Sequence, residues 1–535
     1  MLSIRRYTYI LLCTLIMMYS STCTLQREEK EKKEHGKVSH IFRKGNGSEP
    51  QDLDPGIITG NIESQVVENL FEGLTTPDLH TGLPSPGVAE SWKPNADATV
   101  FTFYLRKNAV WSNNDPVTAH DFVYAWRRVL NPKLAAEYAY ILFYIKNAQA
   151  FNSGKLNDPE MIGVKALDDY TLQVQLEGPT PFFDQLTYFF TYDPVHKKTV
   201  EKYGRNWTKP ENIVTNGAFL LDRWLHQERI VLKKNPTYWD ASNVKLTTVE
   251  LLPIENLDTE QKLFASGELD YTKEVPDIRI PFLRKKPFFR SDPFLTIYMY
   301  RLNVTKKPFD NEKVRMALKL AIDRKKITDY IKKAGELPAY SLVPPGIHGY
   351  TSPNVLEFDV KKARALLAEA GYPHGKGFPS LEILYNTQLD HQRIALALQD
   401  MLRKNLNIEV KLFNQEWKVY LNNVKTLNYD IARGGWIGDY IEPSAFLNIF
   451  TSKSGMNQTG WENSEYDELI KEAAATVDTQ VRYSLYQKAE ELLLEKGPFI
   501  PIYFYTRSYL LNPKIKGFLP NLLDMHLLKY VYFEE

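Results

Sequence analysis

Hydrophobic and polar residues alternate along most of the chain with the periods of strands and helices. Residues 100–111 (VFTFYLRKNAVW) and 171–176 (TLQVQL) alternate at every second position, which predicts strands with one buried face. Between them, apolar side chains recur every three or four residues after Thr118, and Asp121 stands three residues after that threonine. This spacing predicts an amphipathic helix that begins after Thr118 and ends before Pro132.

The second half of the chain continues this mixture of helix and strand patterns. A helical stripe consists of Val314, Ala317, Leu318 and Ala321. Asp359 is the predicted N-cap of a helix that Gly371 stops. A strand at 381–386, a helix at about 391–405 and a strand at 407–414 then follow. A β-α-β order is typical of an α/β lobe with parallel strand pairing.

The stretch YDIARGGWIGDYIEPSAFL (429–447) combines a strand pattern with exposed backbone and chemically active side chains. It begins like a strand and then places Gly434 and Gly435 before Trp436 and Asp439. Glycine lets another backbone approach closely because it has no Cβ. Taken alone, the stretch is compatible with a catalytic acid, a buried ion pair or a ligand clamp.

Composition narrows the class of protein. At 535 residues the chain is too long for one simple core, so we expect two or three domains. Aromatic residues make up 13% of the chain and include 32 tyrosines, which favours extended contact surfaces. The formal net charge is +1 and the basic residues form no stripe, so nothing indicates nucleic-acid binding.

The N-terminus has the form of a bacterial export signal. Two arginines precede an apolar run that ends in small residues and is too short and wrongly flanked for a stable membrane span. We expect residues 1–22 to be a signal peptide that directs the protein to the periplasm. Cleavage before Cys23 would allow lipidation of that cysteine, and ordinary cleavage nearby is the alternative. Residues 23–37 have the pattern of a charged, solvated tether.

The sequence lacks the common motifs of nucleophilic, phosphate and zinc chemistry. It has no Walker A loop and no G-x-S-x-G, H-E-x-x-H or C-x-x-C motif, and its ten histidines are scattered. We therefore expect no cofactor and no metal site. A binding protein is favoured over an enzyme, although a hydrolase could still assemble its site from distant residues.

Several segments, which follow one another in a characteristic order, give the chain a family resemblance. In the first half they are NGSEPQDLDPG (46–56), LFEGL (70–74), PGVAESW (86–92), the long run 103–132, GVKALDDYTLQVQL (163–176), NIVTNGAF (212–219) and NPTYW (235–239). In the second half they are VRMALKLAIDR (314–324), LLAEAGYP (366–373), NQEW (414–417) and the stretch 429–447. In this order the segments resemble the oligopeptide-binding proteins of bacterial ABC importers, over essentially the whole chain after the tether.

The resemblance implies a fold and a division into domains. The expected fold is an α/β, two-lobed periplasmic-binding-protein fold (class II, the large cluster C type) with an additional inserted domain. Lobe I would comprise 38–61, 188–295 and 507–535, with the inserted domain at 62–187. Lobe II would comprise 296–506, and the ligand would lie between lobes that close around a hinge.

The resemblance also implies residues for the amino end and the backbone of a bound peptide. Asp439 matches the family position that binds the α-ammonium group of the peptide. The main chain from Gly435 through Trp436 to Ile437 would pair with the extended peptide backbone. Trp436 and Trp417 would form walls of side-chain pockets, with core burial as the alternative for each.

Three cations match the family positions that meet the carboxylate of peptides of different lengths. Arg433 would provide a bidentate clamp, His391 a switchable donor and Lys332 a mobile point charge. The alternatives are an ion pair with Asp430 for Arg433, a helix-start role for His391 and a solvated helix face for Lys332. Further positions near the implied peptide strand are Glu49, Gln51, Tyr140 and Tyr505.

The sequence also departs from the family pattern. Arg301 stands where an acidic residue is usual, and Lys273 lies in a stretch that replaces an asparagine-rich one. Either cation could suit an additional carboxylate on the ligand. Thr296 and Ile437 occupy the positions of the family's disulfide, so that disulfide is absent.

The implied function is that of a non-enzymatic receptor, expected to be a monomer. It would capture short peptides with a free N-terminal amine and deliver them to ABC permease subunits and their ATPases, with membrane contact only through a lipid anchor. A receptor for murein (diaminopimelate-containing) tripeptides is the alternative within the same family. A peptide hydrolase and a surface adhesin or folding helper are alternatives of other classes.

Overall fold

The structure, a computed structural model, describes residues 41–534. The predicted signal peptide (1–22), Cys23 and the predicted tether (23–37) lie outside the described residues. Within this range, none of the helices combines the length and the apolar character that crossing a membrane requires.

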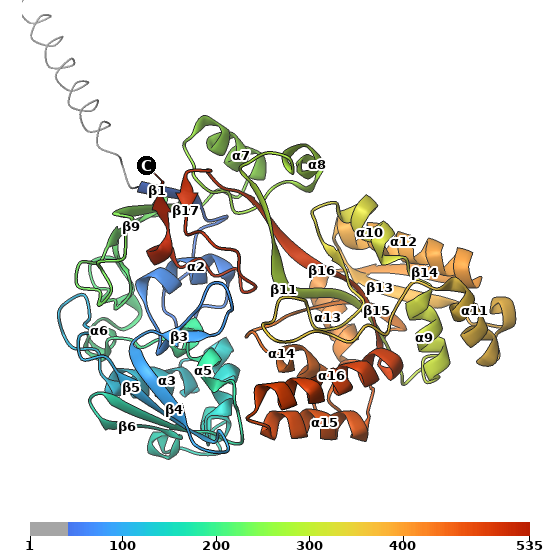
Figure 1. Cartoon of the computed structure of the whole chain (residues 1–535), viewed down its shortest axis with the longest axis horizontal. Helices are drawn as coiled ribbons and strands as arrows, with labels where there is room; N and C mark the ends of the chain where they lie inside the picture. Colours follow the sequence, from blue (N-terminus) through green and yellow to red (C-terminus); the bar gives the residue numbers. More distant parts are fainter. Residues whose placement is uncertain (1–40, 535) are drawn as a thin grey trace, which may run out of the picture. The chain divides into compact units, whose positions relative to one another are not determined.

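The largest sheet contains six strands in the order β12-β16-β11-β15-β13-β14 (Figure 1). Its strands are β11 (Phe289–Leu302), β12 (Leu337–Pro338), β13 (Leu381–Asn386), β14 (Val410–Gln415), β15 (Ile431–Ile437) and β16 (Phe499–Leu510). Strands β13 and β14 are parallel, and helix α12 (Leu389–Leu406) joins them. This confirms the predicted β-α-β order, because parallel neighbours need a crossover connection such as a helix.

Helices accompany this sheet, and α9 and α11 lie where the periodicity predicts them. They are α9 (Glu312–Leu320), α10 (Arg324–Ile327), α11 (Val360–Glu369), α13 (Trp417–Lys425), α14 (Ser444–Leu447), α15 (Ser464–Ala475) and α16 (Thr479–Lys496). The predicted apolar stripe that includes Val314 and Leu318 is fully buried. The Asp359 side chain caps α11 by accepting a hydrogen bond from the Lys362 N–H at 2.9 Å. Gly371 then adopts a φ of +96°, a conformation that favours glycine and ends the helix.

Strands β11 and β16 are long and pair with each other in antiparallel fashion, and Figure 1 shows them side by side. The domain boundaries expected at 295/296 and 506/507 fall inside these two strands. The pairing shifts register between Pro293 and Ile297. Proline cannot donate a ladder hydrogen bond, so the pairing is interrupted close to the expected boundaries.

A four-stranded sheet in the order β4-β5-β7-β6 forms another part of the fold. Its strands are β4 (Ala89–Pro94), β5 (Val100–Leu105), β6 (Val164–Asp168) and β7 (Thr171–Gln175), and α3 (Ala119–Leu130) packs on it. Helix α3 begins with the predicted capping box, in which Asp121 Oδ2 accepts the Thr118 N–H at 2.8 Å. The prediction that one strand runs to Trp111 was wrong, because the chain turns after Leu105 and Val110 forms only an isolated bridge.

A third sheet has the order β1-β10-β9-β8. Its strands are β1 (Ile41–Gly45), β8 (Phe219–Leu225), β9 (Arg229–Lys234) and β10 (Thr248–Leu252). Helix α2 (Asn61–Leu70) contacts β8 of this sheet, whereas α6 (Lys197–Tyr203) contacts α3 and the pair β2 (Thr75–Pro77) and β3 (Pro84–Pro86) contacts β4 of the second sheet. Further elements are α7 (Leu257–Ser266), α8 (Ile280–Leu283) and the pair β17 (Ile515–Lys516) and β18 (Tyr532–Phe533). The C-terminal segment returns to α2, where Asn69 Oδ1 accepts the Leu528 N–H at 2.8 Å.

A buried ion pair anchors the segment that follows β15. Arg482 of α16 donates to Glu442 at 2.9 Å, and both side chains are almost completely inaccessible to water. The Tyr483 hydroxyl donates to the other oxygen of Glu442 at 3.1 Å. A buried carboxylate with several donors is held firmly, because removing one partner leaves the charge uncompensated.

We predict that Arg482→Met destabilises the protein through this pair. The substitution should lower the free energy of unfolding by about 3–5 kcal/mol, because Glu442 then remains buried without its cation. Urea denaturation followed by tryptophan fluorescence would measure the change. Lys313→Met is the matched control, because its ion pair with Glu369 is exposed and should contribute about 1 kcal/mol or less. Equal effects of the two substitutions would contradict the anchoring role.

Candidate functional site

Strand β15 sets the geometry of the candidate site through its pairing with β11. Arg433 lies opposite Tyr300, Gly435 opposite Tyr298 and Ile437 opposite Thr296. Since side chains alternate between the faces of a strand, Arg433, Gly435 and Ile437 lie on one face of the sheet.

The two glycines of β15 lie in closely packed surroundings. A Cβ at Gly434 would lie 2.4 Å from Nη1 of Arg301, and a Cβ at Gly435 would lie 3.1 Å from the carbonyl oxygen of Ile297. Gly434 therefore makes room for the side chain of Arg301. This space inside the protein was not anticipated from the sequence.

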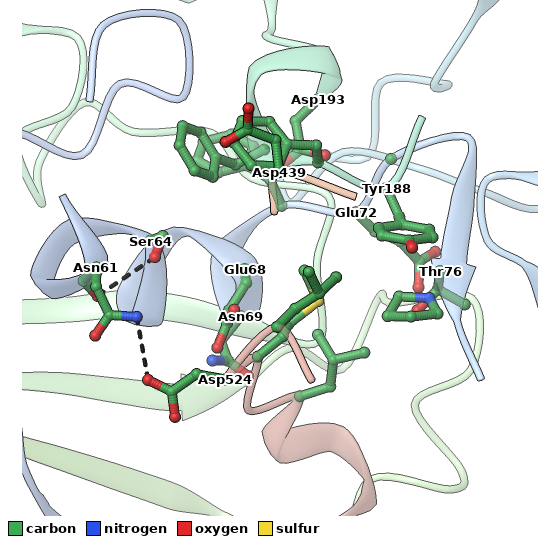
Figure 2. A pocket seen from close by; sticks show the side chains of 18 of the residues that line it. Asn61, Ser64, Glu68, Asn69, Glu72, Thr76, Tyr188, Asp193, Asp439 and Asp524 are labelled. Carbon is green, nitrogen blue, oxygen red and sulfur yellow. Dashed lines mark hydrogen bonds between the residues drawn. The ribbon is translucent and has the colours of Figure 1, made fainter. Parts of the chain in front are cut away.

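Two cavities meet at the end of β15. Both are lined by Phe294, Ile437, Asp439 and Arg507. The larger one, of about 590 Å³, is also lined by Tyr140, Thr296, Arg433, Gly435, Trp436, Met456, Tyr505 and Thr506, and we call it the aromatic cavity. The other, of about 240 Å³, contains the carboxyl groups of Glu68, Glu72, Asp193, Asp439 and Asp524, and we call it the acidic cavity (Figure 2).

Asp439 lies at the junction of the two cavities. Its Oδ2 accepts a hydrogen bond from the Tyr140 hydroxyl at 3.3 Å, and among the described residues it has no cationic partner. Partial burial raises the pKa of the Asp439 carboxyl to about 6. A partly dehydrated carboxylate without a cation is poised to bind a positively charged group from a ligand.

The backbone around Asp439 is held on both sides. The Tyr440 ring stacks on Phe182 with centroids 4.9 Å apart and an interplanar angle of 6°, and its hydroxyl lies 3.2 Å from that of Tyr144. A Cβ at Gly438 would lie 2.7 Å from a methyl group of Leu295. These contacts fix the position of the carboxylate before any ligand arrives.

Arg433 is a second half-buried charge, and it has no acidic partner among residues 41–534. Its guanidinium lies over the Tyr298 ring at 4.8 Å and donates to the Tyr505 hydroxyl at 3.3 Å. Its Nε is buried without a hydrogen-bond partner. The alternative of an ion pair with Asp430 is wrong, because Asp430 pairs with Lys306 at 3.2 Å. Arg433 therefore offers an unpaired cation to the aromatic cavity.

The family model for bacterial extracellular solute-binding proteins, family 5 (middle part), matches residues 84–458. The chain belongs to this family. The periplasmic oligopeptide-binding protein OppA of Salmonella typhimurium is 42% identical over 486 residues, which cover 89% of each chain. The periplasmic murein peptide-binding protein MppA of Escherichia coli is 39% identical over 481 residues, which cover 88% of each chain.

A solved structure of the murein tripeptide-binding protein MppA, in its unliganded open form, superposes on this family 5 protein with a TM-score of 0.86. The two are 38% identical, and the match covers 93% of this chain and 98% of that chain. The fold class is therefore an α/β fold with two lobes and an extra domain, as the resemblance implied. Family 5 proteins are binding proteins for transport.

His391 is not placed as a charged donor in this family 5 protein. It is buried in the first turn of α12, and its Nδ1 lies 3.2 Å from the Tyr298 hydroxyl. Burial, together with the charge of Arg433, lowers the pKa of His391 to about 3. The imidazole is therefore neutral at physiological pH, and it contacts the ring that lies under Arg433 and lines neither cavity.

Lys332 lies on a π-helical turn (Thr328–Lys332) and is engaged by acidic side chains. It pairs with Asp390 at 2.7 Å and with Glu336 at 3.7 Å. The alternative, in which the Lys332 side chain lies on a solvated helix face, therefore does not describe its surroundings. Lys332 lines neither cavity, so Arg433 is the member of the expected cation set that reaches the site.

The two tryptophans occupy different environments. Trp436 lines the aromatic cavity and its Nε1 donates to the Ala445 carbonyl at 2.6 Å. Trp417, at the start of α13, is 48% exposed and stacks on Tyr420 with centroids 5.6 Å apart. Trp417 lines neither cavity, and it is also not part of the core.

Of the four remaining residues expected near the peptide, two line a cavity and two do not. Tyr140 and Tyr505 both line the aromatic cavity. Glu49 instead closes the turn between β8 and β9, where it accepts the Gln227 N–H at 3.0 Å. Gln51 is exposed and uses its backbone N–H to bind the side chain of Glu63. Glu49 and Gln51 line neither cavity.

The departures from the family pattern have structural explanations of their own. Arg301 is 9% exposed and lies beneath Gly434, and Lys273 donates to Asn61 Oδ1 at 2.7 Å. Neither of them lines a cavity, so they are not placed to contact an additional carboxylate. Thr296 and Ile437, which replace the family's disulfide, are direct partners across β11 and β15.

The acidic cavity was missed by the sequence analysis. Its carboxyl groups come from α2, from residue 193 and from the C-terminal segment, so no local spacing connects them. Within the described residues, no group of three or more His, Cys, Asp or Glu side chains is arranged to hold a metal ion.

We predict that Asp439→Asn stabilises the empty protein at neutral pH. Because the folded-state pKa of about 6 lies above the unfolded value of about 3.9, the Asp439 carboxyl lowers the free energy of unfolding progressively as the pH rises from about 4 to 6, and the full penalty is present above pH 6. The substitution should raise the free energy of unfolding by on the order of 1–3 kcal/mol at pH 7.5, and this gain should vanish near pH 4. Thermal denaturation at both pH values would measure it.

Asp430→Asn is the control for this prediction. Asp430 immediately precedes β15 but is paired with Lys306, so its substitution should lower the melting temperature at pH 7.5. A loss of stability for Asp439→Asn at both pH values would mean that Asp439 has a structural partner.

Proposed function

We propose that this protein is a transport receptor that captures short peptides and delivers them to an ABC permease. The observation that carries the proposal is that Asp439 and Arg433, two opposite charges without an ion-pair partner in the described part of the chain, lie in the wall of one cavity. A peptide with free ends carries an ammonium group and a carboxylate, which complement these two charges. The aromatic cavity, at about 590 Å³, lies within the range of roughly 300–1,000 Å³ that is usual for small-molecule sites.

The backbone of β15 supports a strand-like ligand. One edge of β15 pairs with β11 along its whole length, whereas pairing with β13 on the other edge extends only over Ile431 and Ala432. Within residues 41–534, the edge from Gly434 to Ile437 has no strand partner on that side. An open edge beside a cavity suits the addition of an extended peptide as a further strand.

The relatives support the ligand class and supply one narrower candidate. The Salmonella typhimurium relative is an oligopeptide-binding protein. A murein tripeptide is the second candidate, favoured by the high structural similarity to the murein tripeptide-binding protein MppA. Because Arg301 and Lys273 line neither cavity and Lys273 is hydrogen-bonded to Asn61, this candidate would need other residues to recognise additional carboxylates.

The cellular context is part of the same proposal. Residues 1–22 would act as an export signal, with Cys23 as the site of a lipid anchor or, alternatively, with ordinary cleavage nearby. The partners would be the permease subunits and their ATPases, and the receptor would act as a monomer without turning over its ligand. A peptide that is released intact distinguishes a receptor from a hydrolase, and ligand-induced closure distinguishes it from an adhesin.

We predict that acetylating the N-terminus of the peptide and substituting Asp439 weaken binding to the same extent, because both remove the same contact. Calorimetric titration of ligand-stripped protein with Ala-Ala-Ala should show binding, and N-acetyl-Ala-Ala-Ala should bind roughly 10- to 150-fold more weakly, the equivalent of about 1.5–3 kcal/mol. Asp439→Asn should weaken Ala-Ala-Ala to a similar extent and have little further effect on the acetylated peptide. The corresponding test at the other end of the ligand uses Arg433→Met and a peptide with a C-terminal amide. Each change should weaken binding, and the substitution should have little further effect on the amidated peptide.

Equal losses of the free and the acetylated peptide in Asp439→Asn would contradict the ammonium clamp. Mass spectrometry of the ligand released by denaturation tests the ligand class independently. A mixture of short peptides would support a general peptide receptor, and a single diaminopimelate-containing species would support the murein candidate.

A further inference from the structure

The acidic cavity begins where the peptide's amino end would lie. It shares Asp439 and Ile437 with the aromatic cavity and extends from them toward α2 and the C-terminal segment (Figure 2). If Asp439 binds the α-ammonium group, the first side chain of the peptide is the part of the ligand closest to this space. The chemistry of the acidic cavity therefore bears on which first residue is preferred.

The carboxyl groups of the acidic cavity outnumber its cations. Glu72 pairs with Lys529 at 2.9 Å, and Asp524 pairs with Arg507 at 3.4 Å. The other three carboxyl groups belong to Glu68, Asp193 and Asp439. None of these three forms an ion pair within the part of the chain that the structure describes. Burial raises the pKa of Glu68 to about 8, although Lys44 and Lys273 lie near enough for their charges to lower it. The empty cavity thus has more acidic groups than directly paired cations among the described residues.

Asp193 is the group that most clearly lacks a partner. Its side chain lines the cavity, yet the residue is only 5% exposed. Its carboxyl oxygens have no hydrogen-bond donor among residues 41–534, although its backbone N–H donates to the Phe190 carbonyl at 3.0 Å. Burial, and then the nearby carboxyl groups of Glu72 and Glu68, raise the pKa of Asp193 well above its usual range.

The backbone at Gly73, which also lines the acidic cavity, packs closely against Asp193. A Cβ at Gly73 would lie 3.1 Å from Oδ1 of Asp193 and 2.3 Å from the carbonyl oxygen of Thr187. Leaving a buried polar group without a partner is unfavourable, typically by about 1–3 kcal/mol in proteins. Such a group on a cavity wall indicates that a partner from outside the chain completes the site.

The rest of the lining specifies what kind of partner fits. Aromatic rings on the wall belong to Tyr138, Phe189, Phe190 and Phe294. Carboxyl groups combined with aromatic faces favour an organic cation on an apolar stem, because the rings contact both the methylene groups and the charge. A cavity of roughly 150 Å³ can hold benzene, so the 240 Å³ here is sufficient for one long side chain.

We propose that the acidic cavity is a subsite for the basic side chain of a peptide whose first residue is lysine or arginine. This inference rests on the proposed function, because Asp439 must bind the peptide's α-ammonium group for the first side chain to enter. Glu68 and Asp193 bind the side-chain cation, while Asp439 serves the main chain. The receptor therefore selects among peptides by the charge of their first residue.

The test compares peptides that differ only in this charge. Ligand-stripped protein is titrated calorimetrically with Lys-Ala-Ala, norleucine-Ala-Ala and Ala-Ala-Ala at neutral pH. Norleucine retains an apolar stem and lacks the ammonium group. We expect Lys-Ala-Ala to bind about tenfold or more tightly than the norleucine peptide, because a charge-assisted hydrogen bond in a dehydrated cavity is strong.

Variants locate the origin of this preference. In Asp193→Asn and in Glu68→Gln, the ratio of the two dissociation constants should fall toward one. Asp184→Asn is the matched control, because Asp184 is also largely shielded and its pKa is raised to about 6 by burial, yet it lines neither cavity. The ratio should therefore survive in Asp184→Asn. Glu68→Gln tests the subsite independently if Asp193→Asn does not fold.

Each outcome separates the subsite from the proposed function. If Ala-Ala-Ala binds but the lysine and norleucine peptides bind equally, the subsite is overturned and the peptide receptor stands. A preference that persists in both Asp193→Asn and Glu68→Gln also overturns the subsite. If none of the three peptides binds, the proposed function itself fails.

Discussion

The pairing of β11 with β16 is the interaction on which the rest of the structure depends. β15 pairs with β11, and β13 and β14 follow from β15, so the whole six-stranded sheet is built outward from this pair. The same two strands supply Phe294, Thr296, Tyr505 and Arg507 to the cavities. Hydrogen-bonded strands cannot slide independently, since a slip of one residue would turn every side chain to the other face. The site therefore inherits its geometry directly from the main-chain ladder.

Around this ladder the protein holds ionisable groups that are buried at a cost to its own folding. Asp439, Arg433 and Asp193 are at least partly buried without an oppositely charged partner among the described residues. The surrounding structure compensates by fixing the backbone, as the stacking of Tyr440 on Phe182 illustrates. Natural proteins commonly accept such local costs at functional sites, because preorganised charges bind a ligand without further rearrangement. The two cavities are the places where these costs are concentrated.

Local features of the fold were predictable, and long-range partners were not. The capping box of Thr118 and Asp121 and the β-α-β unit at 381–415 involve residues close in sequence, so spacing alone identified them. His391, by contrast, was expected to be a switchable donor to a ligand carboxylate, but it is buried against Tyr298, which lies 93 positions away in the sequence. Burial decides the protonation of such a residue, and no local pattern reports how deeply a side chain is buried.

By itself, the sequence determined the family, the α/β class and the stretch that carries Asp439 and Arg433, because these depend on ordered motifs and on periodicity along the chain. Only the tertiary structure decided that Arg433 has no acidic partner among the described residues, that Lys332 is already paired, and that carboxyl groups from distant segments share one cavity. The physical reason is that charge compensation and dehydration are properties of a residue's neighbours in space. Those neighbours are assigned by strand pairing and packing across hundreds of residues.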